Sequence, residues 1–211
     1  MYKVFVNNKP IILTTKVEKE TNFKNYLLKT VHIGKVIKDL KNTKLQSARL
    51  IDFDKNKLIK NFLKLLPTTI AGGGKVYNEN GKVLFIYRND KWDIPKGGTK
   101  RNETIDQTAL REVEEEKGVK DLSITKPLEI TYHIFKRNVN HKIKITYWFE
   151  MKTNFTGELV PQAKEGITKA EWLTKEQIDV AMNNSYANIK LLVYCVSFHY
   201  MLRRRINAKE K

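Results

Sequence analysis

Hydrophobic and polar positions alternate between strand-like and helix-like spacing over the first third of the chain. The segments indicated are a hairpin over residues 2–15 with a turn at 7–10, a partly helical stretch over 23–41, a strand over 47–53 and a helix over 55–66 capped by Asp54. Pro67 follows this last apolar repeat. We therefore predict that residues 1–66 form a small α+β N-terminal unit.

Strand and helix signals continue to alternate over the remaining two thirds. They indicate a hairpin with an Asn80-Gly81 turn, a charged helix between Thr104 and Gly118, strands over 128–135 and 143–151, and helices that begin at Thr174 and Ala187, the last reaching Arg205. Strands with interspersed helices predict an α/β sandwich. Residues 67–211 are therefore expected to form the main domain, with helices at its C-terminal end.

Positive charge is the strongest compositional signal. The 211 residues carry 40 Lys and Arg against 23 Asp and Glu, a formal net charge of +17. Residues 1–66 alone hold 15 basic against 5 acidic residues. Such an excess either serves solubility or attracts a polyanion, whether a highly phosphorylated small molecule or a nucleic acid. Composition alone leaves both alternatives open.

Cellular location is indicated by what the sequence contains. Cys195 is the single cysteine, so no internal disulfide can form. The first residues lack the pattern of a signal peptide, and the apolar run Leu191–Leu202 is too short to cross a bilayer. We expect a cytoplasmic protein without a membrane partner, and we interpret this run as a buried or interfacial helix.

An acidic cluster stands out within residues 97–119 of this basic chain. Four glutamates occur within five residues, and on a helix Glu112, Glu115 and Glu116 share one arc. Like charges at this spacing repel, so Arg111 can offset Glu115 one turn away, and a divalent cation such as Mg²⁺ or Mn²⁺ can neutralise the rest. The alternative is a solvated acidic helix face.

The same helix carries signals of burial and of defined ends. Its apolar stripe is expected to pack on a sheet and to place the acids at the packing edge; it consists of Ile105, Ala109 and Val113. Thr104 with Gln107 fits a capping box, and Gly118 is expected to end the helix.

The spacing of residues 97–119 resembles the Nudix box. Every specified position of that pattern is filled, by Gly97, Glu103, Arg111, Glu112, Val113, Glu115, Glu116, Gly118 and Val119. The resemblance implies the Nudix α/β/α sandwich with a mixed sheet over roughly residues 67–185, and it leaves residues 1–66 unexplained. It also implies a metal-dependent pyrophosphohydrolase that cleaves a phosphoanhydride bond in a nucleoside-diphosphate-X substrate.

Residue roles follow from this resemblance. Glu112, Glu115 and Glu116 are expected to bind Mg²⁺ or Mn²⁺, with backbone near Gly97 contributing to the metal site. Arg111 is expected to orient the glutamates, and Glu103 to brace the helix or reach the metal through water. The attacking water is activated either by Glu112 or by Glu165, whose alternative is a solvated loop acid.

The substrate is indicated by residues outside the box. The run Trp92-Asp-Ile-Pro-Lys-Gly resembles the branch that acts on diadenosine polyphosphates and diphosphoinositol polyphosphates. In such a site Lys96 would meet a phosphate, Lys100 and Arg101 could assist, and His133 could contact substrate or be an ordinary strand histidine. ADP-ribose, nucleoside triphosphates and RNA 5′ ends remain alternatives.

A function without turnover stays open as well, because some Nudix folds are ligand sensors. Nucleic acid is a less favoured partner than a phosphorylated small molecule. The N-terminal unit could cover the active site, bind a polyanion or form a homodimer through its hairpin edge.

Overall fold

The computed structural model of the chain describes residues 1–41 and 44–194, apart from the side chains of residues 116, 117 and 164. It divides into two compact units. The N-terminal unit contains residues 1–71 and 131–146. The C-terminal unit contains residues 72–130 and, within the described chain, 147–194. Each unit is described by itself below.

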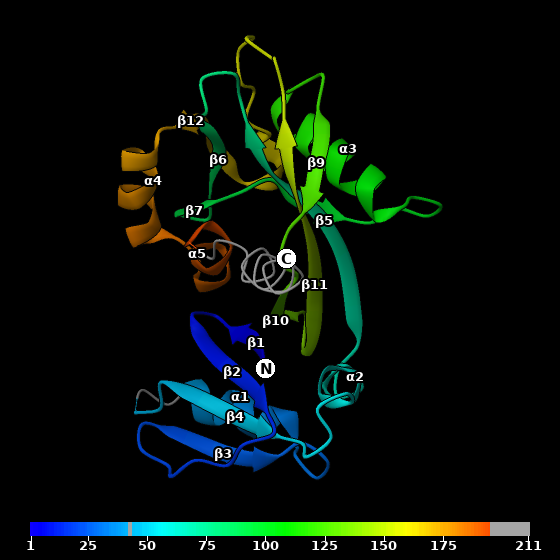
Figure 1. Ribbon diagram of the computed structural model, residues 1–211, viewed down its shortest axis with the longest axis vertical. Coiled ribbons are helices and arrows are strands. Elements are labelled where there is room, and N and C mark those ends of the chain that lie inside the picture. Colours follow the sequence, from blue (N-terminus) through cyan, green and yellow to red (C-terminus); the bar gives the residue numbers. More distant parts are fainter. Residues whose placement is uncertain (42–43, 195–211) are drawn as a thin grey trace, which may run out of the picture. The chain divides into compact units, whose positions relative to one another are not determined.

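The N-terminal unit is a mixed sheet with two helices (Figure 1). Its elements are β1 (Tyr2–Val6), β2 (Lys9–Thr14), β3 (Phe23–Leu27), α1 (Ile33–Lys41), β4 (Ser47–Ile51), α2 (Leu58–Leu63), β10 (Thr131–Arg137) and the first part of β11 (Asn140–Lys152). Strand β1 pairs antiparallel with β2 and parallel with β10, and β4 lies between β2 and β3 in parallel pairing. The predicted β1–β2 hairpin and the strand over 47–53 are confirmed.

Two predictions for this unit were wrong. Residues 23–27 form a strand instead of the start of a helix, because they pair in register with β4 and their backbone is satisfied by that ladder. Asp54 does not cap α2: its carboxylate accepts from the backbone of Asn56, and the helix begins later, after Lys57, which makes no side-chain cap. Asp54 therefore forms an Asx-type turn before the helix.

The core of the N-terminal unit lies between its sheet and α1. Helix α1 buries Ile33, Val36, Ile37 and Leu40, and the strands bury Val4, Ile11, Leu13 and Leu50. Tyr26 of β3 donates a hydrogen bond of 2.6 Å to Asp39 of α1, which ties the edge strand to the helix. Burial and the neighbouring carboxylate raise the pKa of the Tyr26 phenol, so it stays protonated as the donor.

The C-terminal unit is an α/β/α sandwich. Its further elements are β5 (Thr68–Tyr77), β6 (Val83–Arg88), β7 (Lys91–Asp93), β8 (Lys96–Gly98), α3 (Ile105–Lys117), β9 (Ser123–Pro127), η1 (Ala163–Glu165), β12 (Ile167–Leu173), α4 (Lys175–Ala181), η2 (Met182–Asn184) and α5 (Ala187–Tyr194). Strand β6 pairs antiparallel with β5, β7 and β12, and β9 pairs antiparallel with β11. The predicted turn between β5 and β6 is confirmed, with Gly81 at φ +69°.

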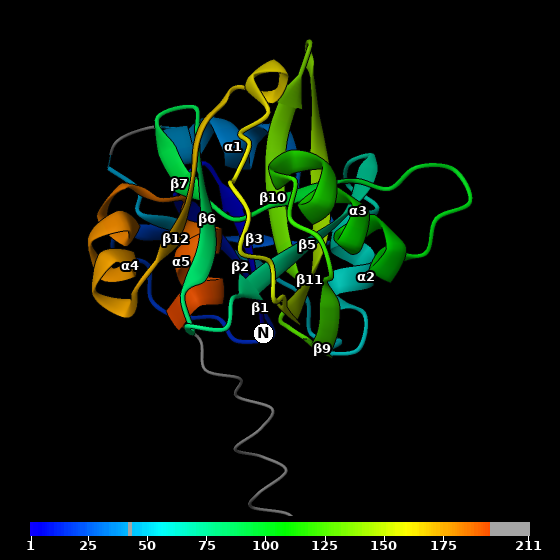
Figure 2. The ribbon, with the colours of Figure 1, turned by 90° about the horizontal axis from the view of Figure 1, so that it is seen from above.

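Alternate residues of β6 face different helices, which defines the two layers. Leu84 packs with Ala109 and Val113 of α3, whereas Phe85 packs with the residues of α4 and α5. Figures 1 and 2 show α3 and α4 on opposite sides of β6. This arrangement confirms the predicted α/β/α sandwich with a mixed sheet.

Helix α3 has the predicted ends and packs close to the sheet. Thr104 and Gln107 form a capping box, and Gly118 ends the helix in the left-handed region at φ +66°. Gly72 of β5 permits the close approach, since a Cβ there would lie 2.8 Å from the backbone nitrogen of Ala109. Helix α3 therefore packs directly against the backbone of β5.

The division of the chain differs from the expected boundary between residues 66 and 67. The β10–β11 hairpin up to residue 146 groups with the N-terminal unit, because β1 pairs with β10 from Val4↔Tyr132 to Val6↔Ile134. Separate roles for 1–66 and 67–211 stay a prediction. The predicted C-terminal helix is described as α5 up to Tyr194, and Cys195 lies outside the described residues. Among the described helices, none is long and apolar enough to span a membrane.

Candidate active site

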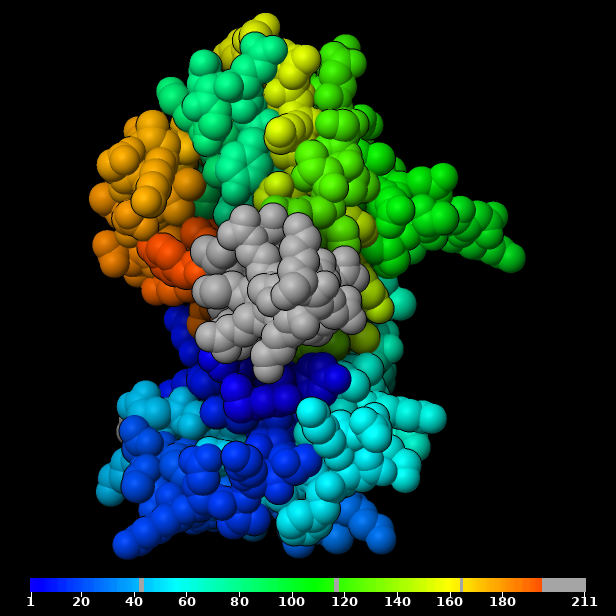
Figure 3. Space-filling view, in the orientation of Figure 1, coloured from blue at the N-terminus to red at the C-terminus, as the bar shows by residue number. Residues whose placement is uncertain are grey.

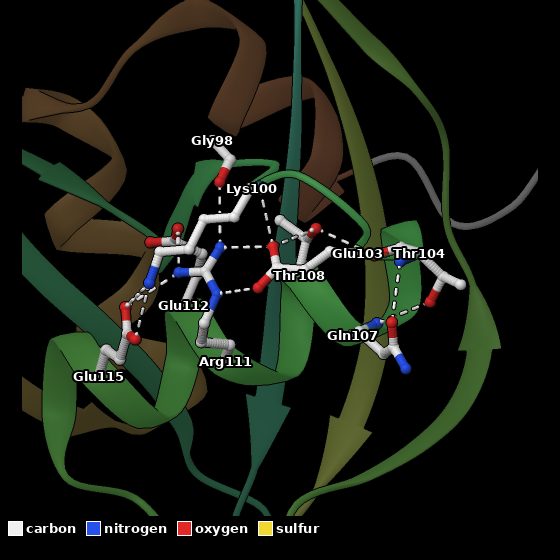
Figure 4. A network of polar contacts seen from close by, with 9 residues as sticks. All are labelled: Gly98, Lys100, Glu103, Thr104, Gln107, Thr108, Arg111, Glu112 and Glu115. Atoms are coloured by element: carbon white, nitrogen blue, oxygen red, sulfur yellow. Dashed lines mark hydrogen bonds and ion pairs between the residues drawn. The ribbon is translucent and has the colours of Figure 1, made fainter.

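Arg111 of α3 lies at the centre of an acidic network (Figure 4). Its Nε donates to Glu103 at 2.5 Å, and one terminal nitrogen donates to Glu112 at 2.6 Å and to Glu115 at 2.9 Å. The other terminal nitrogen donates to Glu103 at 2.9 Å and to the carbonyl of Gly98 at 3.0 Å. One guanidinium thus holds three carboxylates and the loop that precedes the helix.

Glu112 is the buried carboxylate of the network, with 7% of its surface exposed. Its side chain lies directly against Gly97, where an added Cβ would overlap the carboxylate. Burial raises the pKa of Glu112, Arg111 acts in the opposite direction, and the charges of Glu165 and Glu115 raise it further. Glycine at position 97 is therefore required for Glu112 to occupy this place.

Glu103 fixes the loop to the helix. Its carboxylate accepts from Arg111, from the backbone of Lys100 at 2.9 Å and from Thr108 at 3.1 Å. The bond from Arg111, followed by the backbone bond, lowers the pKa of Glu103 to about 2. This geometry agrees with the expected bracing role.

Glu115 lies at the exposed edge of the same network. It pairs with Lys100 at 3.0 Å and with Arg111 at 2.9 Å, and Lys100 is the larger cause of the lowered pKa of its carboxyl. The predicted i,i+4 pair between Arg111 and Glu115 is thus present. Gln162 donates to the backbone carbonyl of Glu115, which joins the segment before η1 to the helix.

The acidic set fits a hard divalent cation by the chemistry of its donors. Glu112 is a desolvated carboxylate beside backbone, and Glu115 lies one turn along on the same arc. Glu116 belongs to α3, but its side chain lies outside the described residues. Among the described side chains, no group of three His, Cys, Asp or Glu is arranged to hold a metal. Arg111 contacts one oxygen of Glu112 and one oxygen of Glu115, so these bonds do not occupy either carboxylate fully.

Glu165 comes close to the network from η1. It contributes to the raised pKa of Glu112, and it pairs with Arg88 at the end of β6 at 3.6 Å. Arg88 shares its face of β6 with Leu84, on the side of α3. Sequence reasoning missed Arg88, because this contact depends on the register between β6 and β12.

Lys96 is already held by a neighbour. It forms an ion pair with buried Asp93 and lies over the ring of Trp148, 5.8 Å from its centroid. Sequence reasoning missed Asp93, because i,i+3 spacing predicts an ion pair only on a helix, and Asp93 and Lys96 belong to β7 and β8. Lys96 would therefore have to share its charge between Asp93 and any phosphate.

The remaining predicted substrate contacts fall in different places. Lys100 and Arg101 lie in the exposed loop before α3, which projects in green in Figure 3. Lys100 is paired with Glu115. His133 lies half-buried on β10 and belongs to the N-terminal unit. Its contact with substrate stays a prediction.

The family is decided by comparison with known proteins. The model of the NUDIX domain matches residues 68–192, which is more than half of the chain. The chain belongs to the Nudix family. The match includes residues 72–130 and 147–192 of the C-terminal unit. Residues 97–119 are its Nudix box.

Two relatives of this Nudix chain are named as hydrolases. An uncharacterised Nudix hydrolase of Listeria monocytogenes is 34% identical over 113 residues, covering 49% of this chain and 62% of the relative. An RNA pyrophosphohydrolase of Bartonella henselae is 29% identical over 116 residues, covering 46% of this chain and 66% of the relative. The chain thus spans less than two thirds of either relative. The solved structure of a C. elegans Ap4A hydrolase matches with a TM-score of 0.43 and 20% identity, over 55% of this chain and 86% of that one.

Proposed function

We propose that the chain is a metal-dependent pyrophosphohydrolase that cleaves a phosphoanhydride bond in a nucleoside-diphosphate-X type of substrate. The observation that carries this proposal is the placement of Glu112. Its carboxylate is buried against the glycine backbone of the box and oriented by Arg111. Arg111 and Lys100 offset only part of the charge of this acidic arc, and a divalent cation would neutralise the rest.

Glu112, Glu115 and Glu116 are the residues that would hold Mg²⁺ or Mn²⁺, together with backbone near Gly97. When bound, the metal supplies charge neutralisation at the diphosphate and acidifies water. Arg111 and Glu103 keep the carboxylates oriented. These roles for the acidic residues are our proposal.

We propose that either Glu112 or Glu165 accepts a proton from the attacking water. The raised pKa of Glu112 brings this carboxyl nearer to neutral pH, where a proton acceptor is most effective. Glu165 is the alternative, because it approaches Glu112 from η1 and is held by Arg88. Either carboxylate acts without a covalent intermediate on the protein.

The favoured substrates are dinucleoside polyphosphates or diphosphoinositol polyphosphates. Support comes from the Trp92-to-Gly97 run and from Lys96, Lys100 and Arg101, which we propose as phosphate contacts, with His133 as a further one. ADP-ribose and nucleoside triphosphates are second candidates. RNA with a 5′ diphosphate or triphosphate is a third, because one relative is named for that activity.

A hydrolysis panel with product identification tests this function. Diadenosine polyphosphates, diphosphoinositol polyphosphates, ADP-ribose, nucleoside triphosphates and 5′-triphosphorylated RNA are compared with Mg²⁺ and with EDTA. The proposal predicts EDTA-sensitive cleavage of one class and its loss in Glu116→Gln with the fold retained. Silence over the whole panel, together with measured Mg²⁺ binding, would favour a ligand sensor.

A further inference from the structure

Positive charge is segregated between the two units. The N-terminal unit, residues 1–71 and 131–146, holds 19 Lys and Arg against 5 Asp and Glu, a formal net charge of +14. Residues 72–130 and 147–194 hold 16 against 17, a net charge of −1. A lysine-rich composition that served solubility alone would be expected in both units. The excess of positive charge therefore lies in the N-terminal unit.

The few carboxylates of this unit are already engaged within it. Glu18 pairs with Arg49, and Asp54 pairs with Lys57 at 2.9 Å. The other three also accept hydrogen bonds inside the unit: Glu20 from Asn25, Asp39 from Tyr26 and Asp52 from Asn61. Five bound acids cannot neutralise 19 cations, so most of the positive charge faces outward.

A cationic surface is formed by exposed lysines of α1 and of the β10–β11 hairpin, two elements of the same unit. We define it by Lys35, Lys38 and Lys41 of α1 and Lys136 of β10, all of them exposed. Lys136 lies opposite His141 in the hairpin register. Burial and the charges of Lys41 and Lys136 lower the pKa of His141.

We infer that this cationic surface binds the phosphate backbone of a nucleic acid. Charge complementarity favours a long polyanion, since an excess of 14 charges spread over a whole unit matches a repeating phosphate backbone better than one small substrate. An anionic membrane fits less well: the apolar stripe of α1 is buried in the core, so the helix has no apolar side to insert into lipid. The inference does not depend on hydrolysis.

Fluorescence anisotropy of the full chain with a labelled RNA tests the inference. The probe is an oligoribonucleotide of about 20 nucleotides, longer than the ~4–16 nucleotides that one binding domain covers. It carries a 5′ hydroxyl and is used in EDTA, so neither a phosphoanhydride nor turnover is involved. We expect binding whose affinity falls linearly on a log–log plot between about 50 and 200 mM salt.

The variant K35Q/K38Q/K41Q/K136Q removes the cationic surface. It should weaken binding roughly tenfold or more and reduce the salt slope by about 3, at ~0.7 per lost phosphate contact. The matched control K120Q/K126Q/K152Q/K175Q removes four exposed lysines from the C-terminal unit. It changes the net charge equally and should keep wild-type affinity. Circular dichroism verifies that both variants are folded.

Three results would overturn the inference. They are the absence of RNA binding by the wild-type chain at the lowest salt, an equal loss of affinity in both quadruple variants, and binding to phosphatidylserine vesicles without binding to RNA. The last would assign the surface to a membrane. If the wild-type chain binds RNA but hydrolyses no substrate of the panel, the proposed function is contradicted and this inference stays intact.

Discussion

The guanidinium of Arg111 carries five N–H donors in one rigid plane. In this chain the donors are distributed over Glu103, Glu112, Glu115 and the carbonyl of Gly98. Lysine carries the same charge but cannot reach these partners at fixed angles. The geometry of the side chain, in addition to its charge, keeps the acidic residues in place.

Arg111→Lys should therefore weaken Mg²⁺ or Mn²⁺ binding by ~10–100-fold, the usual effect of losing a residue that orients metal ligands. Calorimetric titration of each metal measures this change. The matched control is Arg101→Lys, because Arg101 is an exposed arginine of the loop before α3. This variant should bind metal like the wild type. Unchanged affinity in the Arg111 variant would contradict the orienting role.

The adjacent glycines Gly97 and Gly98 provide a test of where the Glu112 carboxylate lies. A Cβ on Gly97 overlaps the Glu112 carboxylate, whereas a Cβ on Gly98 meets nothing within 4 Å. Gly97→Ala should lower kcat about 10²-fold, because the carboxylate is displaced, and leave Tm nearly unchanged, because the end of a side chain can move. Gly98→Ala should retain activity. Equal activities in the two variants would contradict the placement of Glu112.

Contacts within one helix were predictable from the sequence, and contacts between strands were not. The pair Arg111–Glu115 follows from helical spacing. The pair Arg88–Glu165 requires the antiparallel register of β6 and β12, including its irregularity between Ile167 and Lys169. No local spacing encodes that register, so Arg88 could not be assigned.

Helix α3 and the loop before it form one element held at both ends. The capping box and Gly118 fix the helix, and Glu103 ties the loop to it through Arg111 and the backbone of Lys100. Because the pKa of Glu103 is lowered from 4.5 to about 2, its ionised form stabilises the fold. This contribution is present above pH 4.5 and is lost as the pH falls toward 2.

Glu103→Gln removes that contribution. In EDTA the variant should have a lower Tm than the wild type at about pH 6, and the difference should shrink between pH 4.5 and 2 as Glu103 is protonated in the wild type. Thermal unfolding of both proteins over this range measures it. Glu114→Gln, on the exposed side of α3, serves as the control. A difference that stays constant with pH would contradict the role of the Glu103 charge.

The contact between β6 and η1 can be tested by a double-mutant cycle. If Arg88 acts by holding Glu165, then Arg88→Ala and Glu165→Gln should each lower kcat, and the double variant should lose no more than Glu165→Gln alone. Arg88→Lys should restore part of the rate. Losses that multiply in the double variant would show that the two residues act independently.

Element prediction succeeded where hydrophobic spacing and end signals agreed. Helix α3 has both an apolar stripe and caps, and Thr174 forms a second capping box at the start of α4. The roughly helical spacing of the apolar residues over 23–41, which includes Tyr26 and Leu27, predicts helix for the residues of β3 as well. Its conformation is decided by pairing with β4, a long-range contact.

The chain folds into two units that cannot be separated by one cut in the sequence, because the N-terminal unit consists of two sequence segments. The β10–β11 hairpin lies within the region that the family model matches, yet it completes the sheet of the N-terminal unit. The predicted boundary at residue 66 came from local signals at Pro67. Pairing between residues about 130 positions apart, such as Val4 and Tyr132, leaves no such local signal.

A fragment that starts at Pro67 should therefore fold poorly. Removing β1 leaves the edge of β10 unpaired and exposes Ile134, which is 2% exposed in the chain. We expect aggregation, or a lower Tm with fast hydrogen exchange in β10. A monomeric fragment with wild-type Tm and protected β10 amides would contradict this and support 67–211 as an independent domain.

The split sheet also has a consequence for synthesis on the ribosome. Residues 1–71, which include β1, are translated before β10, and the 59 residues between positions 71 and 131 separate this segment from the parallel partner of β1. At ~5–20 residues per second, roughly 3–12 s pass before the partner is translated. During this interval the apolar edge of the nascent N-terminal segment is open to chaperones and to neighbouring nascent chains. Residues 72–130 add 11 basic and 11 acidic residues, so the growing chain keeps a net charge of +10 through this interval. Repulsion between copies on one polysome therefore opposes their aggregation.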